Sequence, residues 1–116
     1  MEKQKKIHIY ELIGSKDAVS SEDGNALFKE IFKALNEDTI VTLDFSKIEF
    51  ITSTFLNAAI GQLYSKYNSA KLREYLKLEN IVNGDLAILK RVVERAKQYF
   101  KDKENMDDAI DETLNG

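Results

Sequence analysis

The sequence predicts a small α/β sandwich, in which helices pack on a four- or five-stranded mixed sheet. Three observations support this fold class. Short β-branched and aromatic runs alternate with segments of helical apolar spacing, in the order β-α-β-(β)-α-β-α. A chain of 116 residues is long enough for one domain but not for two. Proline, which interrupts both helices and strands, is absent from the chain.

The N-terminal third is expected to hold a strand and a helix. Ile7–Ile13 is rich in β-branched and aromatic residues, and we expect it to be a strand followed by a loop over residues 14–20. Ser20 or Ser21 offers an N-cap, and the acids that follow suit the positive end of a helix dipole. The apolar residues that give residues 22–36 their helical spacing are Leu27, Phe28, Ile31, Phe32 and Leu35.

The middle of the chain is expected to continue with strand and helix. Thr39–Phe45 has the composition of a buried strand, and Ile48–Ile51 is either a short extension of it or a second strand. Thr52 or Ser53 then caps a second helix over about residues 54–67, which has one broad apolar face.

The C-terminal third predicts one more strand and one more helix. Charged and apolar residues alternate over Leu76–Ile81, which is typical of a half-exposed edge strand. Asp85 caps a third helix over about residues 86–101, with a continuous apolar stripe. We therefore expect a domain over residues 1–101 and an acidic C-terminal tail over residues 102–116.

The tail differs from the domain in charge. Residues 102–116 hold six acidic residues and one lysine and so carry −5, whereas the rest of the chain holds 16 basic and 14 acidic residues. Met106, Ile110 and Leu114 recur at helical spacing, which predicts a short amphipathic helix. It is expected either to fold back on the basic third helix or to stay mobile until a partner binds.

The composition excludes several classes of protein. The chain has no cysteine, which excludes disulfides, thiolate metal sites and thiol nucleophiles. His8 is the single histidine, so we expect no metal site, and the near-neutral domain argues against a nucleic-acid binder. No apolar run approaches the roughly 20 residues that span a bilayer. Since Met1–Lys6 is not followed by the apolar core of a signal peptide, we expect a cytoplasmic protein.

One segment, residues 43–56, carries most of the functional information, because it joins a buried strand to a helix through a hydroxyl-rich loop. Thr52, Ser53 and Thr54 stand where the helix begins. Backbone N–H groups there lack partners within the helix, and the dipole favours an anion such as a phosphorylated hydroxyl. The same residues also suit a simple N-cap. Asp44, at the end of the strand, is expected to accept N–H groups of the loop and so to shape it.

This segment resembles the signature of STAS domains, the fold of bacterial anti-sigma factor antagonists. In that family a strand ending in Leu-Asp-x-Ser is followed by a short apolar stretch and by Asp-Ser-Ser-Gly-Leu, which opens a helix. Ser53 and Thr54 fall on the two hydroxyl positions, and Thr54 takes the place of the serine that is phosphorylated in the family. Thr52 stands where the family has aspartate, and Phe55 where it has glycine. The other positions in register are Leu43, Asp44, Ser46, Ile48, Phe50 and Leu56.

Most of residues 7–101 is more similar still to a divergent STAS-like family of unknown function, notably over residues 52–64 and 89–100. The resemblance implies a STAS-type sandwich of bacterial origin that regulates a protein partner. That partner would be an ATPase of the histidine-kinase-like fold. The nucleotide would then belong to the partner, and this chain would need no cofactor of its own.

The second predicted helix carries a narrow stripe of small, uncharged residues. At about 100° per residue, the stripe lies opposite the apolar face. Its members are Thr54, Asn57, Ala58, Gly61 and Ser65. Exposed helix surfaces normally carry lysine and glutamate, so small residues indicate the close approach of another backbone. Either a protein partner or another helix of the same domain satisfies this pattern.

Two classes of function remain open from the sequence. The first is a non-catalytic interaction module whose partner surface comprises Thr52, Ser53, Thr54, Asn57, Ala58, Gly61 and Ser65, with Thr54 or Ser53 as candidate phosphoacceptor. The second is a small-ligand or anion binder, or an enzyme, that uses the hydroxyls at the helix N-terminus. The missing cysteine, single histidine and absent glycine-rich loop favour the first. A structural role in homodimerisation lies between them.

Overall fold

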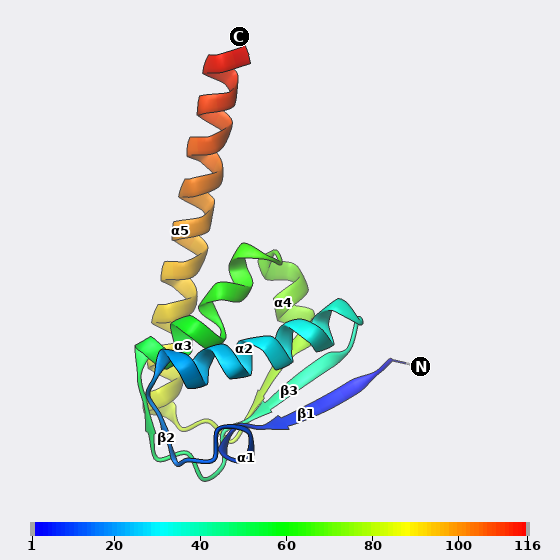
Figure 1. The fold of residues 1–116 in the computed structure, drawn as a ribbon, viewed down its shortest axis with the longest axis vertical. Helices are drawn as coiled ribbons and strands as arrows, with labels where there is room; N and C mark the ends of the chain where they lie inside the picture. The colour runs from blue at the N-terminus through cyan, green and yellow to red at the C-terminus, as the bar shows by residue number, and fades with distance from the viewer. Residues whose placement is uncertain (1, 116) are drawn as a thin grey trace.

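A computed structural model describes the backbone of residues 2–115 and the side chains of residues 2–101 (Figure 1). Strands and helices alternate along the chain, as the sequence predicts. In order they are β1 (Gln4–His8), α1 (Ile9–Ile13), β2 (Asp17–Ala18), α2 (Ser21–Asn36), β3 (Ile40–Asp44), β4 (Phe50–Ile51), α3 (Ser53–Ala59), the 3-10 helix η1 (Gly61–Ser65), α4 (Ser69–Tyr75), β5 (Leu76–Glu79) and α5 (Asn83–Asn115).

The strands form two small parallel sheets rather than the single mixed sheet that we expected. One sheet has the order β1-β3-β5, and the other pairs β2 with β4. Every pairing within the described residues is parallel. β4 is not part of the first sheet. It pairs instead with β2, the strand before α2, with Asp17 opposite Phe50 and Ala18 opposite Ile51. β5 lies at an edge, as its alternation of charged and apolar residues predicts.

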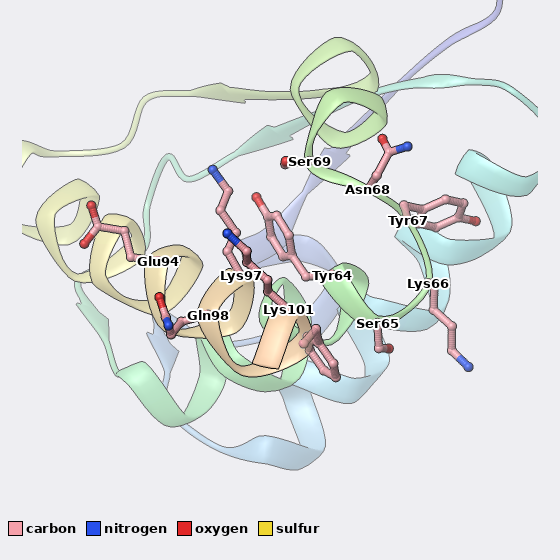
Figure 2. A pocket seen from close by; sticks show the side chains of 11 residues that line it. Tyr64, Ser65, Lys66, Tyr67, Asn68, Ser69, Glu94, Lys97, Gln98 and Lys101 are labelled. Atoms are coloured by element: carbon pink, nitrogen blue, oxygen red, sulfur yellow. The ribbon is translucent and has the colours of Figure 1, made fainter. Parts of the chain in front are cut away.

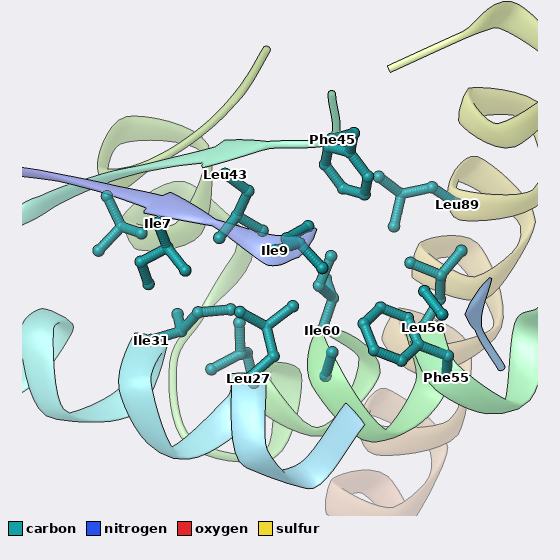
Figure 3. Close-up of a cluster of buried hydrophobic side chains, with 14 of the residues drawn as sticks. Ile7, Ile9, Leu27, Ile31, Leu43, Phe45, Phe55, Leu56, Ile60 and Leu89 are labelled. Atoms are coloured by element: carbon teal, nitrogen blue, oxygen red, sulfur yellow. The ribbon is translucent and has the colours of Figure 1, made fainter. Parts of the chain in front are cut away.

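The hydrophobic core lies between the three-stranded sheet and the helices α2 and α3. Figure 3 shows Ile7 and Leu43 of the sheet facing Leu27 and Ile31 of α2. α2 and α3 approach closely at Gly24, where an added Cβ would lie 2.6 Å from the carbonyl oxygen of Phe55. Only glycine allows this spacing, so the position of α3 against α2 is fixed by backbone contact.

The N-terminal strand is shorter and earlier than we expected. The predicted strand Ile7–Ile13 divides into the end of β1 and the helix α1. Ile7 and Ile9 are both buried, which is the two-residue period of a strand, but the chain then turns at the edge of the sheet into one helical turn. Gly14 ends that turn with a φ of 69° and donates its N–H to Tyr10.

The predicted helix over residues 54–67 is also divided. α3 ends at Ala59, Ile60 departs from helical geometry with φ −117° and ψ −42°, and η1 continues with tighter i→i+3 bonds. α4 follows, in a segment for which no element was predicted. Its local signal is Asn68, which accepts the N–H of Lys71 and so caps the helix.

α5 begins at Asn83, three residues before the expected start, and its backbone helix continues to Asn115. Its N-terminal half packs on α3 and η1, and Figure 1 shows its C-terminal part extending away from the other elements. The side chains of residues 102–116 lie outside the described residues, and with them the predicted docking of the tail. Among the described residues, no helix is long and apolar enough to cross a membrane.

Candidate functional site

The loop before α3 is held in place by Thr52. Its hydroxyl accepts the N–H of Phe55 at 3.2 Å, so Thr52 is the N-cap, as one of the two predicted alternatives had it. The same hydroxyl donates to the carbonyl of Val19 at 2.8 Å, and the Thr52 N–H donates to Ala18. Thr52 therefore connects α3 to the segment that follows β2, and its hydroxyl is fully used in this structural role.

Ser53 and Thr54 differ from Thr52 in their surroundings. Both side chains are exposed, and within residues 2–101 no hydrogen bond is made by either hydroxyl. Both occupy the first turn of α3, which has only seven residues. These two hydroxyls are therefore accessible to a partner protein or a modifying enzyme.

The two departures from the STAS signature have structural explanations. Thr52 provides the capping oxygen that an aspartate would supply at the same position. Phe55 is fully buried, and Figure 3 shows its ring in the core beside Leu56. Because the ring points inward, a phenylalanine in place of glycine adds no bulk to the outer face of the loop.

Two large apolar side chains stand exposed on the two segments that meet at Thr52, directly before these hydroxyls in the chain and on the segment that Thr52 bonds. Phe50 of β4 is 62% exposed and Val19, next to β2, is 41% exposed. Ala18, which precedes Val19, and Ile51, which follows Phe50, are both buried. Because successive side chains of an extended chain point to opposite sides, Val19 and Phe50 project on the outer side. We call the surface formed by Val19, Phe50, Ser53 and Thr54 the loop face.

Asp44 ends β3 in a polar cluster at the carboxyl edge of the three-stranded sheet. Only 7% of the residue is exposed. One carboxylate oxygen accepts the Ser46 N–H and the side-chain amide of Asn80, each at 2.9 Å. The other oxygen lies 3.1 Å from Nδ1 of His8. The hydrogen bonds from Asn80 and Ser46 hold the pKa of Asp44 below its ordinary value, at about 2.

The expectation that Asp44 accepts loop N–H groups is confirmed, but the rest of this cluster was not predicted. No partner was predicted for His8, and Asn80 was not considered. The parallel register explains both contacts, because it aligns His8 with Asp44 and Asp44 with Glu79 at the ends of β1, β3 and β5. Strand order is a long-range property, so no local sequence signal indicates these partners.

Asp44 and Glu49 have different partners. Glu49 forms an ion pair with Lys16 at 3.1 Å, whereas Asp44 is occupied by His8, Ser46 and Asn80. Among the described residues, no group of three or more His, Cys, Asp and Glu side chains is arranged to hold a metal ion.

The two smallest residues of the stripe, Ala58 and Gly61, belong to the interior, which corrects their predicted exposure. Ala58 is 8% exposed and packs against Gly24 of α2. Gly61 is buried, and a Cβ added there would lie 3.6 Å from Val92 of α5. The small side chains thus admit two neighbouring helices of the same chain, the second of the two explanations left open. Asn57, which directly precedes Ala58, is exposed.

Ser65, the last member of the stripe, lies apart from the loop face, beside a groove between η1, α4 and α5 (Figure 2). The groove has a volume of about 750 Å³. Figure 2 shows Tyr64 of η1 near Lys97 and Lys101 of α5. No local sequence pattern indicates this groove, because its two walls come from segments some thirty residues apart.

The parallel sheets, the covering helices and the loop that opens α3 define a small α/β domain of STAS type. The chain belongs to the family described as STAS-like domain of unknown function (DUF4325), whose model matches residues 23–86, more than half of the chain. That range contains Asp44 and the whole of residues 50–54. Searches of curated proteins and of solved structures gave no significant match.

Proposed function

We propose that the chain is a non-catalytic regulatory module, and that its loop face binds a protein partner. The observation that carries this proposal is the presence of two exposed, unpaired hydroxyls beside two exposed apolar side chains. The hydroxyls are those of Ser53 and Thr54, and the apolar side chains are those of Phe50 and Val19.

The apolar side chains supply the binding energy in this proposal. A large aromatic ring that is already exposed and held on a short strand loses little conformational freedom when it is buried by a partner. Asn57 lies one helical turn beyond Ser53 on α3 and extends the same surface with a polar group. Ala58 and Gly61 pack inside the domain and are therefore not part of the docking surface. Ser65 is not part of it either, because it lies beside the groove between η1, α4 and α5.

The hydroxyls supply regulation. A phosphate on Ser53 or Thr54 would bring up to two negative charges next to Phe50 and Val19. Burying those charges against an apolar partner surface is costly, so phosphorylation would release the partner. Thr52 is a poor phosphoacceptor by comparison, because its hydroxyl is engaged with Val19 and Phe55.

For the partner we propose an ATPase of the histidine-kinase-like fold, which is the class that the STAS signature implies. Such a partner brings its own nucleotide and can phosphorylate the hydroxyl that it contacts. The proposal therefore assigns to this chain the surface and the phosphoacceptor, and assigns the nucleotide and the chemistry to the partner.

Affinity capture from the native host tests this function. Tagged wild-type chain should retain an ATPase of that fold, identified by mass spectrometry, and Phe50→Asp should abolish its retention. Val82→Asp is the matched control, because Val82 is also 62% exposed but lies in the β5–α5 connection. Equal retention by wild type and Phe50→Asp, with both folded by circular dichroism, would refute the loop face as the docking surface.

Phosphorylation is tested on the same material. The intact mass of chain isolated from the host should show a phosphorylated species that phosphatase removes and that is lost in the double variant Ser53→Ala with Thr54→Ala. Thr52→Ser, which keeps the capping oxygen, should leave the modification in place. A chain that stays unmodified under all growth conditions would remove regulation by phosphorylation from the proposal.

A further inference from the structure

The groove of Figure 2 is positively charged where α5 passes it. Lys97 and Lys101 of α5 and Lys66, just beyond η1, line it together with a single acid, Glu94. Within the described part of the chain, none of these three lysines forms an ion pair with a carboxylate. Among the described side chains, the groove therefore presents a net charge of +2 without neutralising partners.

The groove also offers an apolar surface. Tyr64 and Phe100 are half-buried in its lining, and the Nζ of Lys97 lies 6.0 Å from the Tyr64 ring centroid. A second hollow, of about 300 Å³, is lined by Gly61, Ala96 and Tyr99, whose side chain is 60% exposed. Phe100 lines both hollows, so they flank the same turns of α5. Such a surface suits an amphipathic segment of acidic character.

The chain contains one segment of that character. Residues 102–116 carry −5, and their sequence spaces Met106, Ile110 and Leu114 at helical intervals. While α5 remains helical, the segment beyond its first turn is held away from the groove of its own chain. The backbone helix continues past Lys101 to Asn115, and its rise of 1.5 Å per residue carries the acidic residues away from the domain (Figure 1).

We propose that two copies of the chain associate through antiparallel α5 helices, so that the acidic segment of each copy lies in the lysine-lined groove of the other. An antiparallel arrangement brings the acidic end of one helix beside the basic part of its partner. A two-fold axis makes both contacts at once and closes the assembly as a dimer. This surface is separate from the loop face, so the dimer leaves Phe50 and Thr54 free for a second partner.

The combination of charge pairs and apolar contacts predicts a dimer whose affinity falls as the salt concentration rises. Charge pairs at an exposed surface are individually weak and are screened as ionic strength rises. The apolar contacts around Tyr64, Tyr99 and Phe100 are not screened and should retain part of the affinity. A two-fold axis places every charge pair at two sites in the dimer. Reversing two charges on each copy should therefore raise the dissociation constant of the dimer by about tenfold or more.

Charge reversal on the full chain, followed by sedimentation equilibrium, tests the arrangement. Wild type should approach twice the chain mass of 13.3 kDa at high concentration. Lys97→Glu with Lys101→Glu should be monomeric, and so should Asp107→Lys with Asp108→Lys. An equimolar mixture of these two variants should form a dimer again, because the acidic substitutions at positions 97 and 101 of one copy then lie beside the basic substitutions at positions 107 and 108 of the other, and the second groove keeps its native pairing.

The matched control is Lys29→Glu with Lys33→Glu on α2, which makes the same change in net charge at two exposed lysines outside the groove. It should dimerise like wild type, and circular dichroism should show every variant folded. A wild type that stays monomeric, including one whose acidic segment folds back on its own chain, would overturn the proposal. A mixture that fails to dimerise, or a control as weak as the groove variant, would overturn it equally.

Discussion

The two polar regions near the start of α3 differ in how far their hydrogen-bonding groups are satisfied. Asp44 is buried at the end of β3, and both of its oxygens are occupied by His8, Ser46 and Asn80. Ser53 and Thr54 are exposed, and their hydroxyls are free within the described structure. A polar group that is buried and fully paired maintains the fold, whereas exposed and unpaired groups are available to other molecules. The comparison separates a structural region from a recognition region.

The largest effect on stability is expected at Asp44. Asp44→Ala removes the acceptor for the Ser46 N–H and the Asn80 amide and leaves both groups partly buried without a partner. The free energy of unfolding should fall by about 3 kcal/mol, measured by urea denaturation. Asn80→Ala should cost less, because Asp44 keeps its other partners. An Asp44→Ala chain as stable as wild type would end the structural interpretation of this cluster.

The acid side of the pH–stability profile should report the same residue. The pKa of Asp44 is lowered from 3.8 to about 2 in the folded chain. Its ionised form therefore contributes stability that is present above about pH 4 and is lost as pH falls toward 2, by at most about 2 kcal/mol. Asp44→Asn removes this titration. Its profile should be flatter than that of wild type between pH 4 and 2, and parallel profiles would contradict the assignment.

Thr52 should show an intermediate effect, because its hydroxyl is fully paired although the residue is only half-buried. Thr52→Ala removes the cap of α3 and the hydrogen bond to Val19, and should lower the free energy of unfolding by about 1 kcal/mol. Thr52→Ser restores both bonds and should recover most of that loss. A serine variant that is no more stable than the alanine variant would show that the hydroxyl is not what matters at this position.

The smallest effect on stability is expected at the exposed hydroxyls. Ser53→Ala and Thr54→Ala should each change the free energy of unfolding by no more than about 0.5 kcal/mol, since neither hydroxyl has a partner to lose. Urea denaturation of both variants beside Asp44→Ala places the two regions on one scale. A loss above 1 kcal/mol at either position would show that its hydroxyl has a structural role.

Local signals in the sequence predicted the parts of the fold that depend on neighbouring residues. The spacing of Leu27, Ile31 and Leu35 indicated α2, and Ser20 was identified as its possible N-cap and accepts the N–H of Asp23. Thr52 as a cap and Asp44 as an acceptor were likewise predicted, because each uses an N–H two or three residues away.

Contacts between distant segments could not be predicted in this way. Burial of Gly61 depends on α5 lying across it, and the His8–Asp44 contact depends on β1 and β3 being neighbours. The alternation of Ile7 and Ile9 continued the strand pattern into α1, because periodicity does not indicate where a sheet ends. Small residues on a helix therefore indicate close packing but do not identify the neighbour.

The most direct test of the loop face is a titration of the captured partner, purified, against variants of this chain by calorimetry. Thr54→Asp places a negative charge on the loop face, and Val82→Asp places one at an exposed position in the β5–α5 connection. We predict that wild type and Val82→Asp bind with similar affinity and that Thr54→Asp binds at least about tenfold more weakly. Equal affinity for all three chains would contradict the assignment of the loop face as the docking surface.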